Sequence, residues 1–139
     1  MSATAAQIAK VRRMVSEPTA DTYTDQDLAG YIEARPCIDE RGEAPFLWDT
    51  ITTPPTKKAN PYWTPTYDLN AAAADLWNEK AAIAAAWFDF SADGAQFSRS
   101  QAYTQAANMA RFYWSRRNPT TLTVRPEPRY PLEDIDAQP

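Results

Sequence analysis

The chain has 139 residues, of which 44% are apolar, and a formal net charge of −4 at pH 7. This length is typical of one domain with a buried core, and the acidic balance disfavours duplex DNA as the main partner, because DNA-binding surfaces are basic. The sequence contains no histidine, which removes the side chain most often used for general acid–base chemistry and for metal binding.

Two short helices are predicted near the amino terminus. Residues 4–16 carry apolar side chains at helical spacing, and Pro18 ends this stretch. Thr24 and Asp27 are spaced as a capping box that starts a second helix, which Pro36 limits to about three turns. The apolar stripes comprise Ile8, Val11, Met14 and Val15 in the first helix and Leu28, Tyr31 and Ile32 in the second.

Residues 36–66 show no sustained period and are predicted to be a long loop rich in proline and aromatic residues. A loop of this length is uncommon inside a compact domain, and its aromatic content is too high for a plain linker. Two interpretations are open: the loop folds over its own domain, or it is an arm that docks on another subunit. The candidate arm residues are Phe46, Leu47, Trp48, Tyr62 and Trp63.

Residues 68–90 form the strongest predicted helix, with apolar residues mostly at spacings of three and four. Alanine-rich runs at 71–74 and 81–86 make this helix slim. Either the alanines only raise helix propensity, or they let neighbours pack closely on both flanks. The apolar stripe comprises Leu69, Ala72, Ala73, Leu76, Ile83, Trp87 and Phe90.

A last helix is predicted to start at Ser98, which has capping-box spacing to Gln101, and to end before Pro119. Residues 118–139 contain five prolines and are predicted to be an extended tail. The sequence therefore predicts an all-α fold. We expect a small bundle of about four helices, a long proline- and aromatic-rich loop between helices two and three, and an extended carboxyl-terminal tail.

Charged side chains of the two long helices are interpreted as solvated. Asp75 and Glu79 lie one turn apart on a polar face, and Lys80 can extend its amine outward past the apolar stripe. Arginines crowd the end of the last helix, where the helix dipole favours positive charge. With Tyr113 and Trp114 they could instead stack on nucleic-acid bases. The arginines are Arg111, Arg116 and Arg117.

No constellation of residues supports enzymatic chemistry. The stretch 89–94 has the alternating oxygens and the glycine of an EF-hand calcium loop, but Ser100 replaces the bidentate glutamate, so a turn between helices is favoured. Cys37 is the only cysteine, which excludes an internal disulfide and fits folding in a reducing cytoplasm. We expect no enzyme, no cofactor, no metal site, no signal peptide and no membrane span.

Six stretches of the chain form a distinctive series: residues 11–15 (VRRMV), 23–28 (YTDQDL), 39–45 (DERGEAP), 67–82 (YDLNAAAADLWNEKAA), 88–94 (FDFSADG) and 97–101 (FSRSQ). In their order and spacing these stretches resemble head–tail adaptor (connector) proteins of tailed bacteriophages. The resemblance covers most of the chain up to Arg117 and adds little beyond it.

The resemblance implies a structural virion protein of the neck, made in the host cytoplasm, whose helical domain (1–117, arm 36–66) forms a ring of twelve copies. Such a ring binds the portal, extends the DNA channel without sequence-specific DNA binding, and supports the next neck or tail protein. The resemblance further implies that the tail, 118–139, anchors on the portal. The alternative is a small DNA-binding or packaging-accessory protein. The candidate portal-binding residues are Leu122, Val124, Arg125, Arg129, Tyr130, Leu132 and Ile135.

Overall fold

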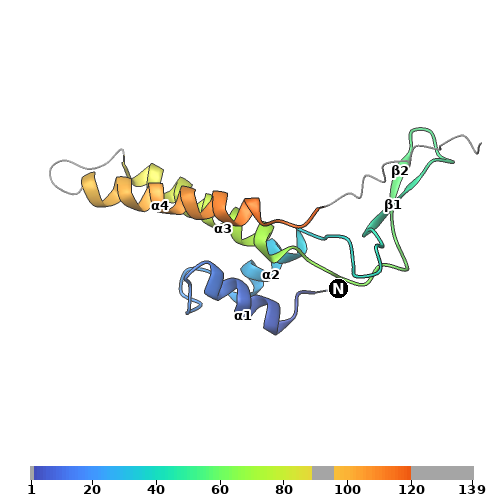
Figure 1. The fold of residues 1–139 in the computed structure, drawn as a ribbon, viewed down its shortest axis with the longest axis horizontal. Coiled ribbons are helices and arrows are strands. Elements are labelled where there is room, and N and C mark those ends of the chain that lie inside the picture. Colours follow the sequence, from blue (N-terminus) through green and yellow to red (C-terminus); the bar gives the residue numbers. More distant parts are fainter. Residues whose placement is uncertain (1, 89–95, 120–139) are drawn as a thin grey trace, which may run out of the picture.

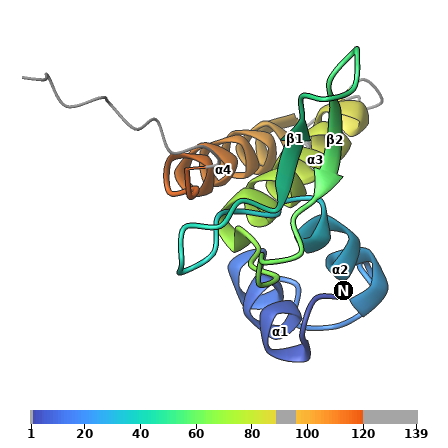
Figure 2. The ribbon, with the colours of Figure 1, turned by 90° about the vertical axis from the view of Figure 1, so that its right-hand side faces the viewer.

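The computed structural model describes residues 2–88 and 96–119, which form four helices and one two-stranded sheet (Figure 1). Helices α3 and α4 lie side by side as a long hairpin, and α1 and α2 pack beside the first half of α3 (Figures 1 and 2). The sheet projects from the end opposite the tip of this helical hairpin. The elements are α1 (Ala5–Met14), α2 (Asp25–Glu33), β1 (Phe46–Asp49), β2 (Thr56–Ala59), α3 (Leu69–Phe88) and α4 (Gln96–Ser115).

Both amino-terminal helices begin at a capping box. The Thr4 hydroxyl accepts from the Gln7 amide and the Gln7 side chain accepts from the Thr4 amide. Thr24 and Asp27 make the same reciprocal pair at the start of α2, which confirms the predicted cap. These bonds satisfy amide groups that would otherwise lack partners in the first turn of each helix.

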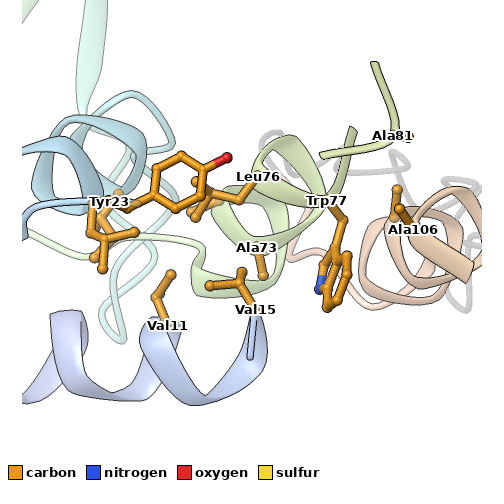
Figure 3. Packing of buried hydrophobic residues seen from close by; sticks show 12 residues of the cluster. Val11, Val15, Tyr23, Ala73, Leu76, Trp77, Ala81 and Ala106 are labelled. Atoms are coloured by element: carbon orange, nitrogen blue, oxygen red, sulfur yellow. The ribbon is translucent and has the colours of Figure 1, made fainter. Parts of the chain in front are cut away.

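The hydrophobic core lies where α1, α2 and the first half of α3 meet. Val11 of α1 and Val15, which caps the end of α1, face Ala73 of α3, while Leu76 lies beside the ring of Tyr23 (Figure 3). The alanines at 71–74 are all buried, so α3 approaches its neighbours closely, as the slim-helix prediction required.

Two side chains of α3 hold the end of α1. The indole Nε1 of Trp77 donates to the Met14 carbonyl at 3.1 Å, and Lys80 Nζ donates to the Val15 carbonyl at 2.6 Å. Lys80 also pairs with Glu17 at 2.6 Å. The prediction that the Lys80 amine extends outward is therefore wrong, because the Val15 carbonyl and the Glu17 carboxylate, both just past the end of α1, accept hydrogen bonds from it.

The all-α prediction is wrong in one segment. Within the expected loop 36–66, β1 and β2 form an antiparallel ribbon in which Phe46 pairs with Ala59 and Asp49 pairs with Thr56. Prolines made this segment look irregular, yet none of them interrupts the ladder, because all lie outside residues 46–49 and 56–59. The four-helix part of the prediction is confirmed.

The start of each long helix bears on how it is capped. Helix α4 begins at Gln96, so Ser98 lies inside the helix and is not its cap. At the start of α3, the Asp68 carboxylate accepts from the amides of Asn70 and Ala71 at 3.0 and 3.1 Å and caps the helix. None of the helices in the described parts of the chain is long and apolar enough to cross a membrane.

Candidate functional site

The sheet is a projecting ribbon whose apolar side chains are not covered. We call residues 46–59 the β arm. Its side chains alternate between two faces, so Phe46 and Trp48 share one face with Lys57, whereas Leu47 lies on the other. The exposed fractions are 42% for Phe46, 48% for Leu47, 67% for Trp48 and 93% for Ile51. Clustered exposed apolar side chains of this kind mark interaction surfaces.

Buried polar groups brace the base of the β arm. The Asp39 carboxylate accepts from the backbone amides of Thr64, Glu43 and Arg41, each at 2.9 Å. The hydrogen bond from the Thr64 amide makes the largest contribution to lowering the pKa of Asp39 below its ordinary value, and those from Glu43 and Arg41 add to it. Burial of the carboxylate acts in the opposite direction. Gly42 adopts a left-handed conformation (φ 84°), which completes the turn around Asp39.

A second buried polar residue, Asn60, ends the ribbon. Its side-chain amide donates to the Ala44 carbonyl and to Glu43 Oε2, both at 2.9 Å, and its carbonyl oxygen accepts from the Tyr62 amide at 3.0 Å. The β arm is thus a projection whose base is held by buried hydrogen bonds, where the sequence predicted a loop that either folds over its own domain or forms an arm. The only local signal was the acid–glycine turn at residues 39–42.

The five candidate arm residues separate into two groups. Phe46, Leu47, Trp48 and Tyr62 are exposed, with Tyr62 at 72%. Trp63 is half-buried: its Nε1 donates to the Cys37 carbonyl at 2.9 Å, and its ring meets Tyr67 edge-on with centroids 6.1 Å apart. Trp63 therefore anchors the base of the arm to its own domain.

One face of the β arm closes over a hollow, which we call the aromatic cleft. It consists of two adjoining hollows of about 800 and 330 Å³ that share Glu33, Pro36, Pro45 and Phe46. Its walls are mainly proline and aromatic rings, and Glu33 and Lys57 bring charge to its lining. The lining includes Pro36, Pro45, Phe46, Trp48, Pro61, Trp63, Pro65 and Tyr67.

Grooves run along both flanks of the α3–α4 hairpin. One has a volume of about 620 Å³ and is floored by small residues such as Ala82, Ala85 and Ala107. The other has a volume of about 350 Å³ and lies between Tyr23 and Ile83, which is 47% exposed. The second alanine-rich run of α3 thus borders open grooves, whereas the first lies inside the core.

The carboxylates that looked like a solvated face have partners. Asp75 receives two hydrogen bonds from Arg35, at 2.6 and 2.8 Å, and Glu79 accepts from the Tyr31 hydroxyl. This contact with Asp75 raises the pKa of Arg35, which stays charged. The interpretation of Asp75 and Glu79 as free surface charge is wrong, because α2 brings Tyr31 against Glu79 and the turn after α2 brings Arg35 against Asp75.

The arginine-rich end of α4 stacks on its own helix. The Arg116 guanidinium lies 4.0 Å from the Phe112 ring centroid, and Arg117 lies 4.2 Å from that of Trp114. These contacts between side chains of the same segment occupy the ring faces of Phe112 and Trp114 on which nucleic-acid bases would stack. This arrangement is consistent with helix-end charge rather than with a base-stacking platform.

Two of the chemistries considered from the sequence can be checked in the described residues. Residues 2–88 and 96–119 contain no cluster of three potential metal ligands. Burial raises the pKa of the Cys37 thiol, which is 1% exposed, so it is poorly suited to act as a nucleophile. The candidate calcium loop at 89–94 lies outside the described residues, as do the candidate portal-binding residues Leu122, Val124, Arg125, Arg129, Tyr130, Leu132 and Ile135.

Comparison with known proteins identifies no relative. No protein-family model, no curated protein and no solved structure matches this chain. Within residues 2–88 and 96–119, the uncovered or hollowed surfaces described above are the β arm, the aromatic cleft and the two grooves.

Proposed function

We propose that this protein is a head–tail adaptor of a tailed phage, a structural subunit that assembles into a ring on the portal. The observation that carries the proposal is the β arm. It has a buried, hydrogen-bonded base around Asp39, yet Phe46, Leu47 and Trp48 remain exposed. A rigid projection with an uncovered apolar surface is suited to contact with a neighbouring molecule.

The two grooves of the α3–α4 hairpin support a ring in particular. In a cyclic assembly each copy uses two different surfaces, one toward each neighbour. The groove beside Ala85 and the groove beside Ile83 lie on different flanks of one hairpin. Small side chains on both flanks permit close helix packing, which fits the requirement for two interfaces.

The remaining parts of the proposal follow from the sequence resemblance and from charge. The tail, residues 118–139, anchors on the portal, and the ring offers a platform to the next neck or tail protein. DNA passes through the ring without sequence-specific contacts. The net charge of −4 supports this passage, because an acidic lumen repels the phosphate backbone.

Reconstitution with a portal tests the proposal. Purified protein is mixed with portal rings of its own phage, and negative-stain electron microscopy scores extra density beneath the portal. We expect a ring in the wild type and its loss in Phe46→Ser. The matched control is Phe112→Ser, since Phe112 is also 42% exposed and also stacks with a cation but lies outside the arm.

Two results would contradict the proposal. The first is wild-type protein that leaves the portal bare under all assembly conditions. The second is salt-dependent binding of the purified chain to bare DNA, abolished when Arg116 and Arg117 are replaced, which would favour the DNA-binding alternative.

A further inference from the structure

The aromatic cleft has the chemistry of a groove for proline-rich peptides. Such peptides adopt an extended polyproline helix and dock on grooves lined with aromatic rings. Here Trp48 and Phe46 come from the β arm, while Trp63 and Tyr67 come from the chain that follows it. The indole of Trp63 is fixed by its bond to the Cys37 carbonyl, so this wall is preformed.

The chain itself contains a segment of matching pattern. Residues 125–131 read RPEPRYP, with Arg125, Pro128 and Pro131 at intervals of three. A polyproline helix has three residues per turn, which would place these three side chains along one edge. Two prolines on one edge with an arginine at the end suit an aromatic groove that carries a carboxylate.

We propose that the aromatic cleft binds residues 125–131 of its own chain. The charges are complementary, because the cleft lining carries Glu33 and Lys57, while the segment carries Arg125, Arg129 and Glu127. The prolines restrict the free segment, so less conformational entropy is lost on docking than for an ordinary peptide.

The root of the tail lies beside the cleft. The Asn118 amide donates to Asp68 Oδ2 at 2.6 Å, and its side chain contacts Cys37 Sγ at 3.9 Å. Asp68 follows the cleft residue Tyr67 directly. Six residues separate Asn118 from Arg125 and span up to about 20 Å when extended, so the segment can reach its own cleft. A short tether gives an effective concentration of roughly millimolar.

Docking would bury apolar surface that is exposed in the free subunit. The segment covers the face of the β arm that carries Phe46 and Trp48, and its own candidate portal-binding residues, such as Arg125 and Tyr130, are then occupied in the cleft. This consequence rests on the proposed function, whereas the docking itself does not. In the assembly the tail would leave the cleft for the portal, and the arm face would become free for a neighbour.

Fluorine NMR of the isolated full-length protein, labelled with 5-fluorotryptophan, tests the docking without any portal. The Trp48→Phe variant assigns the Trp48 signal. In the double variant Pro128→Ala/Pro131→Ala, we expect that signal to shift and to show a larger solvent isotope effect. The matched control, Pro126→Ala/Pro139→Ala, removes two prolines outside the three-residue pattern and leaves the signal in place.

Exchanging the charges of Arg125 and Glu33 tests the direction in which the segment lies in the cleft. We expect Arg125→Glu to move the Trp48 signal as the proline variant does, and Glu33→Arg in the same chain to restore it. A Trp48 signal that is identical in the wild type and the Pro128→Ala/Pro131→Ala variant overturns the proposal. A wild-type signal that changes on dilution places the segment in a neighbouring copy and overturns the intramolecular assignment.

Discussion

The backbone amide of Asn118 donates a 2.6 Å hydrogen bond to Oδ2 of Asp68, which lies fifty residues earlier in the chain. The other oxygen of the same carboxylate caps α3 through Asn70 and Ala71. The Asp68 amide in turn donates to the Arg35 carbonyl at 2.8 Å. The buried residue Asp68 therefore joins the start of α3 and the root of the tail through its carboxylate, and the segment just after α2 through its backbone amide.

Replacement of Asp68 separates these roles. We expect Asp68→Ala to lower the free energy of unfolding by about 2–3 kcal/mol, because it removes both the cap and the bond to Asn118. Asp68→Ser retains a capping oxygen and should lose roughly half as much. Urea denaturation followed by circular dichroism measures both variants. A serine variant as stable as the wild type would show that the bond to Asn118 adds nothing.

Asp39 makes the stability of the chain sensitive to acid. Its pKa in the folded state lies below the ordinary value of 3.8, so the carboxylate stabilises the fold above that pH and loses this effect as the pH falls through its folded pKa. We expect Asp39→Asn to be less stable than the wild type at neutral pH. The two melting curves should converge as the pH falls below 3.8.

Glu40→Gln is the matched control for Asp39, since Glu40 is the adjacent carboxylate and is exposed. Its melting temperature should follow that of the wild type at every pH. A constant difference between Asp39→Asn and the wild type across the acid range would contradict the assignment.

The two alanine-rich runs of α3 should respond differently to the same substitution. Ala73 is fully buried beneath α1, so Ala73→Leu should overpack the core and destabilise the fold by about 1–3 kcal/mol. Ala85 is exposed along a groove, so Ala85→Leu should change stability by no more than about 0.5 kcal/mol. Thermal denaturation measures the contrast, and equal losses at both positions would refute the assigned packing.

Lys80 should be a stabilising residue despite its charge. Lys80→Met retains the length of the side chain but leaves the Val15 carbonyl and the Glu17 carboxylate without their donor, so we expect a loss of roughly 1–3 kcal/mol. Lys10→Met, on the exposed side of α1, is the control and should be nearly neutral. The energy of unfolding in urea distinguishes the two, and a neutral Lys80→Met would contradict the inward contact.

Local sequence determined the helices and most of their ends. Capping boxes such as that of Thr24 with Asp27, helical spacing of apolar residues and limiting prolines act over one or two turns, so they can be identified without knowledge of the fold. The aromatic side chains of Phe46 and Trp48 did not suffice to identify β1. Its partner, β2, is short, polar and carries no alternating pattern.

Tertiary structure alone decided what the charged and aromatic residues do. Asp75 and Glu79 have partners because α2 and the residues just after it lie against α3. Trp63 differs from Trp48 because it meets the Cys37 carbonyl and the Tyr67 ring. Such contacts join residues far apart in the chain, and their strength depends on distance and burial, which no local pattern records. The aromatic cleft arises in the same way, from rings that meet only after the ribbon has folded over the end of α2.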